Sequence, residues 1–191
     1  IEPTSVLVRK QPGLGKEFMP PLDAGSYLYM PVTMPHASIG EVTDVLKKQD
    51  IAFEQIPEIE SAVGKLGRAD SPLDPAPLSM IETVINYYPK YLVDRDGHLL
   101  TFRFDPDETD LCRDRQGTPA LAPDGEPYVI QGKCIRDDAG GLIPDPKGHP
   151  FRLWRPALDP ELNPGREAWP GINSPDDIWA EIVEAGKIPG S

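Results

Sequence analysis

Met80 is the side chain of this sequence best suited to bind a soft metal ion. It follows a loop in which Pro72, Pro75 and Pro77 each fix a φ angle and so restrict the shape of the backbone. A thioether is a neutral, soft ligand that prefers Cu(I) and Ag(I) to Zn(II). A lone methionine in a strand is more often core packing, so the residues alone leave both roles open.

Two further methionines, Met30 and Met34, lie in the segment Tyr29–Pro35. Positions four apart in a strand face the same side about 13 Å apart, which is too far for both side chains to hold one ion. We therefore expect Met30 and Met34 to pack. Met19 lies near the start of the chain and is expected to be structural.

The two cysteines, Cys112 and Cys134, have three possible roles. In an oxidising compartment they could form a disulfide worth about 3 kcal/mol. In a reducing compartment they would be ordinary thiols, and a Cu(I)-binding thiolate pair is the third interpretation. The sequence does not fix the geometry that would decide between them.

Other possible ligands are scattered along the chain. His36, His98 and His149 show no metal-ligand spacing and are expected to be solvated. Asp94–Gly97 and Asp105–Glu108 resemble parts of calcium loops, but the complete ligand order is missing. Turn chemistry is enough to explain the Asp-Gly pair of Asp94–Gly97.

Nothing in the sequence points to catalysis. It contains no nucleophile elbow, no zinc-protease motif and no phosphate-binding loop. We therefore expect no enzyme activity, no catalytic residue and no cofactor.

The composition limits the class of protein. A formal net charge of −12 argues against nucleic acid as a partner, because phosphates would be repelled. No apolar run is long enough to cross a bilayer, and no signal-peptide pattern is visible. The 24 prolines and 17 glycines predict many loops and turns.

Periodicity predicts the elements that would position Met80. Alternation and β-prone residues predict strands over 27–33, 59–66 and 80–87. A capping box at Ser38 and Glu41 predicts a helix that Pro57 ends. A second helix is predicted to begin after Ser174, with Gly186 at its C′ position. The expected apolar face of the first helix is Ile39, Val42, Val45, Leu46, Phe53 and Ile56.

These elements predict an α+β fold, an incomplete ferredoxin-like βαββ(insertion)α arrangement that lacks its final strand. Frequent turn signals such as Asp124-Gly125 and Gly140-Gly141 predict a hairpin-rich, loop-rich inserted lobe. The expected segments are an extended lead-in (1–24), the first half of the subdomain (25–87), the inserted lobe (88–173) and the second helix (174–191).

Several stretches together resemble one family, the heavy-metal efflux pumps of the resistance–nodulation–division superfamily. They are Leu14–Asp23, Leu28–Pro31, Glu60–Arg68 and Ser71–Thr83. The resemblance covers roughly residues 14–87 and 174–191. It implies that 1–24 follows a transmembrane helix of a longer protein and that 25–87 is half of a periplasmic pore subdomain.

The resemblance also implies a role for Met80. Family members that export copper and silver bind the metal through three methionines, and the first lies in a Pro-Leu-x-Met-x-Glu-Thr motif. Pro77–Thr83 matches that motif and places Met80 at its methionine. The resemblance therefore implies Cu(I) or Ag(I) as the transported ion, with the other two ligands expected beyond Ser191.

The resemblance implies partners and a location as well. The expected partners are the remainder of the pump, two further protomers of a homotrimer, a periplasmic adaptor protein and an outer-membrane channel. The expected location is the periplasmic face of the bacterial inner membrane. The alternative is a stand-alone periplasmic binding module in which the inserted lobe contacts a partner protein.

Overall fold

The computed structural model has an α+β fold, as predicted, and the residues that it describes form two helices and antiparallel sheets. The expectations for the lead-in up to residue 23, including Met19, and for the proline-rich loop 68–78 lie outside the described residues. The structure describes residues 24–34, 36–67, 79–113, 117–122, 124–166 and 171–189.

The main sheet consists of β1 (Ser26–Tyr29), β2 (Ile59–Leu66) and β3 (Ile81–Tyr87). β3 lies between the other two and is antiparallel to both, so β1 and β2 run in the same direction. This is the order that the first three strands of a ferredoxin-like sheet would have. The ferredoxin-like assignment itself stays a prediction.

The helix α2 (Ile39–Glu54) begins at the predicted capping box. The Glu41 amide donates to Ser38 Oγ at 3.3 Å, and the Ser38 amide donates to Glu41 Oε2 at 2.7 Å. Two free backbone N–H groups of the first turn are thereby satisfied. The prediction for Ile39 was wrong: it is the first helical residue and is 67% exposed.

The helix α3 (Pro175–Ala185) begins at the predicted N-cap, Ser174, and ends at Gly186. The expectation of a C′ glycine was wrong, because Gly186 is the C-cap and has a right-handed φ of −75°. Here glycine is required by packing, since a Cβ would overlap the Tyr29 hydroxyl.

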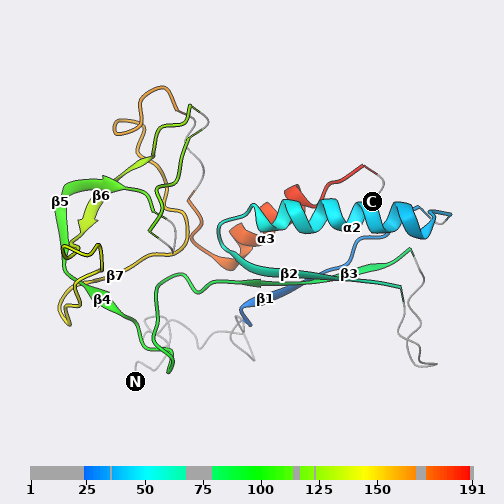
Figure 1. Ribbon diagram of the computed structural model, residues 1–191, viewed down its shortest axis with the longest axis horizontal. Coiled ribbons are helices and arrows are strands. Elements are labelled where there is room, and N and C mark those ends of the chain that lie inside the picture. Colours follow the sequence, from blue (N-terminus) through cyan, green and yellow to red (C-terminus); the bar gives the residue numbers. More distant parts are fainter. Residues whose placement is uncertain are drawn as a thin grey trace, which may run out of the picture.

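Both helices cover one face of the main sheet (Figure 1). The core between the helices and the main sheet contains side chains from both. It also contains side chains from 88–173, the segment predicted to be an insertion. On the opposite face, Leu28, Val63 and Val84 are exposed. The core residues are Phe53, Ile56, Ile59, Ile85, Tyr87, Trp154, Ile172, Ile178 and Ile182.

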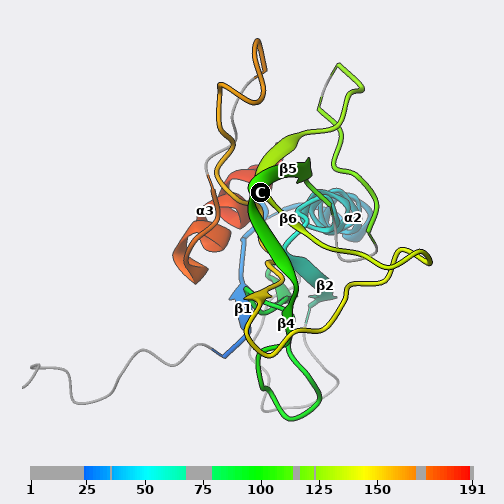
Figure 2. The same ribbon diagram turned by 90° about the vertical axis from the view of Figure 1, so that its left-hand side faces the viewer.

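A lobe of short strands follows β3 and lies beyond one end of the main sheet (Figures 1 and 2). It contains two antiparallel pairs and a small core of its own around Cys112, Tyr128 and Leu158. β4 (Thr101–Phe102) pairs with β7 (His149–Pro150), and β5 (Phe104–Leu111) pairs with β6 (Val129–Cys134).

The lobe repeats one tight hairpin, which fits the predicted hairpin-rich character. Four bridges join residues six apart: Val93 to Leu99, Arg113 to Pro119, Leu121 to Pro127 and Arg136 to Leu142. In each hairpin the residue four after the first bridge partner is a glycine with φ near +85°. Residues with a Cβ rarely adopt that conformation, so glycine recurs at this position.

Candidate metal-binding face

Met80 lies directly before β3 and is held by backbone pairing. It forms an antiparallel bridge with Val32. The Thr33 amide donates to the Ser79 carbonyl at 2.9 Å, and the Ile81 amide donates to the Pro31 carbonyl at 3.2 Å. The hydrogen bonds on both sides fix the position of the Met80 Cα relative to the strand opposite.

Alternation along β3 decides which face Met80 occupies. Ile81, Thr83, Ile85 and Tyr87 are buried beneath the helices. Since successive side chains of a strand point to opposite faces, Met80 belongs to the face that no helix covers. Its side chain is half-buried and is absent from the core clusters of the described residues.

The prediction that Met30 and Met34 pack was wrong. Their exposed fractions are 42% and 70%. The residues that alternate with them, Tyr29 and Thr33, turn toward the helices instead, and Tyr29 packs edge-on against Phe53. When helices cover only one face of a sheet, every second residue of each strand lies on the uncovered face.

The uncovered face carries several apolar side chains, together with an ion pair and a hydrogen bond between Asn86 and Ser61. Besides the methionines it carries Leu28, Val63 and Val84, which lie side by side in the pairing register. Lys65 Nζ lies 3.2 Å from Glu82 Oε2 on the same face. Thioethers on such a face are open to a soft ion from solvent, whereas a methionine in the core is not.

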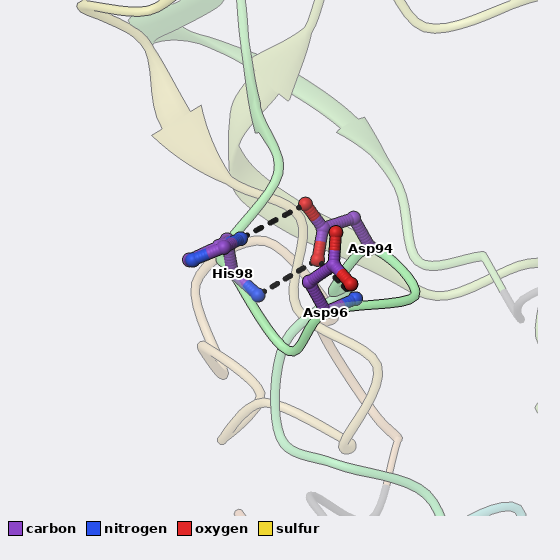
Figure 3. A group of neighbouring side chains, drawn as sticks. All are labelled: Asp94, Asp96 and His98. Carbon is purple, nitrogen blue, oxygen red and sulfur yellow. Dashed lines mark hydrogen bonds and ion pairs between the residues drawn. The ribbon is translucent and has the colours of Figure 1, made fainter.

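Asp94, Asp96 and His98 bring three possible cation ligands within 4.8 Å of one another (Figure 3). Asp94 Oδ1 accepts from the backbone amides of Asp96 and His98 at 2.8 and 2.9 Å, and its Oδ2 lies 3.2 Å from His98 Nδ1. The amide of His98 is the main cause that lowers the Asp94 pKa. These contacts are those of a hairpin turn.

A second hairpin has the same carboxylate–amide contacts without the histidine. Asp137 Oδ1 accepts from the amides of Ala139 and Gly141 at 3.0 and 2.8 Å, with no histidine in the turn. The turn predicted at Asp94–Gly97 is therefore confirmed, and the grouping of the three side chains follows from it.

The segment Asp105–Glu108 lies within β5. The strand pairs with β6 on both sides of a register shift between Asp105 and Thr109. Pro106 has no amide to donate, and a bulge is where a strand tolerates proline.

The two cysteines are free thiols. The Cys112 amide donates to the Tyr128 carbonyl, whereas Cys134 is paired with Phe104 at the other end of the hairpin. Six residues of extended β6 span roughly 20 Å, far more than the Cα separation of about 5.5 Å in a disulfide. Burial raises the pKa of Cys112 to about 11 and also raises that of Cys134, which disfavours the thiolates a Cu(I) pair would need.

A pocket of about 780 Å³ lies between the lobe and the end of α2, away from Met80. Two arginines that line it, Arg113 and Arg136, donate across their hairpins to the carbonyls of Gly117 and Gly140. His149 also lines the pocket, with its ring 4.6 Å from that of Phe104. We therefore assign these side chains to the support of the lobe. His36, His98 and His149 are all exposed, as predicted.

Among the residues that the structure describes, no helix is long and apolar enough to cross a membrane. No family model matches the sequence, and no solved structure matches the fold.

Similarity to curated proteins covers one part of the chain. Over 77 residues it is 40% identical to the cation efflux system protein CusA of Escherichia coli, in strains K12 and O157:H7. SilA of Salmonella typhimurium, also named as a cation efflux system protein, matches equally over 77 residues. The aligned part is 40% of this chain but only 7% of each relative. The resemblance to heavy-metal efflux pumps is thus confirmed for the aligned part, and the chain matches only a small share of the length of these relatives.

Proposed function

We propose that this chain forms part of the wall of the metal-binding cleft in a proton-driven heavy-metal efflux transporter, with Met80 as a ligand for Cu(I) or Ag(I). The similarity to CusA and SilA, both named as cation efflux proteins, supports the transport role. The Pro77–Thr83 motif and the softness of a thioether support the choice of metal.

The observation that carries the proposal is the position of Met80 on the uncovered face of the sheet. A transported ion must reach its ligand and leave again, and a thioether beneath the helices would be closed to it. The backbone bridge to Val32 holds Met80 in place without a covering layer. The helices on the other face leave this side of the sheet available to the cleft (Figure 1).

The proposal extends to the surroundings of the chain. The part described here would lie on the periplasmic face of the bacterial inner membrane. Its partners would be the remainder of the pump, two further protomers, a periplasmic adaptor protein and an outer-membrane channel. The role needs no catalytic residue and no cofactor, because the metal ion is cargo.

The test is the metal resistance of cells that carry the complete pump with Met80→Ile. Isoleucine suits a strand and is apolar but has no sulfur. We expect loss of copper and silver resistance at unchanged protein level. Met34→Ile is the matched control, since it removes an exposed thioether on the same face, and we expect it to keep resistance. Unchanged resistance with Met80→Ile would refute the proposed role of Met80.

A further inference from the structure

The pocket of about 780 Å³ between the lobe and the end of α2 has no part in the proposed function. Small-molecule sites are usually clefts of about 300–1,000 Å³ with mostly apolar walls and a few polar groups. One wall of this pocket is apolar, and Leu121 on that wall is 61% exposed, so apolar surface is open to a ligand. The apolar wall includes Phe104, Leu111, Ala120, Leu121 and Ile130.

Two hairpins of the lobe each place an arginine in this pocket. Arg113 and Arg136 are the first bridge partners of their hairpins, and both line the pocket. Nη1 of each donates to the carbonyl of the glycine four residues later, to Gly117 at 2.8 Å and to Gly140 at 2.9 Å. A guanidinium has five N–H donors, so the support of the hairpin leaves donors of each arginine for another acceptor.

Both guanidiniums lie against the turn of the first hairpin. The Gly117 carbonyl accepts from Arg113, and a Cβ added to Gly117 would lie 4.0 Å from Arg136 Nη1. The thiol of Cys134 is close to the same charge, because burial raises its pKa and Arg136 opposes that rise. Like charges held this near each other repel, and an anion bound between them would offset the repulsion.

The described residues give these two arginines little negative charge. Within the described ranges Arg136 forms no ion pair with a carboxylate, and Arg113 has Asp110 at 3.9 Å from its Nε. Nε of both arginines is buried and has no hydrogen-bond acceptor among the described residues. A buried donor without an acceptor is costly, and a guanidinium binds a carboxylate through two parallel hydrogen bonds. The pair therefore offers donors that an oxyanion would satisfy.

We propose that this pocket binds an organic carboxylate with an apolar body, held by Arg113 and Arg136 at its carboxylate and by the apolar wall along its body. A purely apolar ligand would leave the guanidinium donors unsatisfied, and an inorganic anion would leave the apolar wall in water. The chain carries a formal net charge of −12, which favours a single carboxylate over a multiply charged anion. The site does not use Met80, so its failure would leave the proposed transport role untouched.

The test is a titration of the 191-residue chain with phenylbutyrate, a carboxylate on an apolar body, followed through backbone amide NMR signals. Phenylbutanol has the same body without the charge, and inorganic phosphate has charge without the body. We expect phenylbutyrate to bind at least about tenfold more tightly than either, with shifts centred on 117–119 and 136–142. Equal affinity for phenylbutanol or for phosphate, or no shift in these hairpins, would overturn the inference.

Glutamine variants test the two arginines directly. We expect Arg113→Gln and Arg136→Gln each to weaken phenylbutyrate binding at least about tenfold. Arg103→Gln is the matched control, because Arg103 is exposed in the same lobe and does not line the pocket. We expect this control to keep the affinity, with the backbone spectrum showing that each variant is folded. Unchanged affinity in either pocket variant would contradict the proposed contacts.

Cys134 gives a second measurement that needs no variant. It lines the pocket and is half-buried, whereas Cys112 is buried. At ten times its Kd, phenylbutyrate should leave about one tenth of the sites free, so we expect alkylation of Cys134 by iodoacetamide to slow about tenfold. Phenylbutanol at the same concentration should have little effect. An alkylation rate that phenylbutyrate leaves unchanged would place the ligand elsewhere and overturn the inference.

Discussion

The guanidinium of Arg155 meets the fully buried carboxylate of Glu58, with Nε 3.1 Å from Oε1. The backbone amide of Arg155 donates to the same oxygen at 2.8 Å. Nη2 of the Arg155 guanidinium also lies 3.2 Å from Glu181 Oε2 on α3. Glu58 precedes β2, whereas Arg155 comes from the lobe. Next to it, Trp154 Nε1 donates to the Tyr88 carbonyl at 2.7 Å and its ring enters the main core. The lobe is therefore fixed to the main sheet by buried contacts.

Removing the buried carboxylate should destabilise the whole fold. Glu58→Ala removes a fully buried counterion of the largely buried Arg155, and breaking a buried pair in this way costs about 3 kcal/mol. Glu108→Ala is the matched control, because its pair with Lys133 is exposed and should cost less than about 1 kcal/mol. Urea unfolding measures both. Equal losses would show that the Glu58 pair does not hold the lobe in place.

Two glycines should respond to alanine in opposite ways. Gly64 on β2 lies beneath α2, where a Cβ would overlap the Leu46 side chain, so Gly64→Ala should lower the free energy of unfolding by about 1–3 kcal/mol. Gly40 lies in the first turn of α2, and its nearest neighbour beyond the helix backbone is Ser38 Oγ at 3.8 Å. Gly40→Ala should be neutral or raise stability by up to about 1 kcal/mol. Thermal unfolding compares the two, and a stabilising Gly64→Ala would contradict the packing of α2 on β2.

Stability should decrease at alkaline pH because of Cys112. Its folded pKa is raised to about 11, chiefly by burial, above the unfolded value of about 8.5. The protonated thiol therefore favours the folded state fully below about pH 8.5, and this contribution is lost as pH rises through the folded pKa. The measurement is urea unfolding at pH 8 and pH 10, with Cys112→Ala as the reference. An identical pH dependence in both proteins would contradict the burial of this thiol.

Much of the main sheet could be predicted because local signals agreed with tertiary packing. The capping box at Ser38 and Glu41, and the alternation after Met80, each place an element without long-range information. β5 was not predicted, because its acids and Pro106 are typical of a loop. The strand exists because β6 pairs with it on both sides of a bulge, and that partner is about 25 residues away in sequence.

The candidate site could be predicted only in part. The motif around Met80 identified the residue, but the sequence could not show which face of the sheet the helices would cover. Met30 and Met34 were expected to pack because their spacing is too long for one ion, but both lie on the open face.

The most direct test of the account is X-ray absorption at the copper edge of the Cu(I)-loaded chain in the Cys134→Ala background. We expect a shell of thioether sulfur around copper that Met80→Ile removes and Met34→Ile leaves intact. A sulfur shell that persists in Met80→Ile, or a copper site with only nitrogen and oxygen neighbours, would contradict the claim that Met80 binds the transported ion.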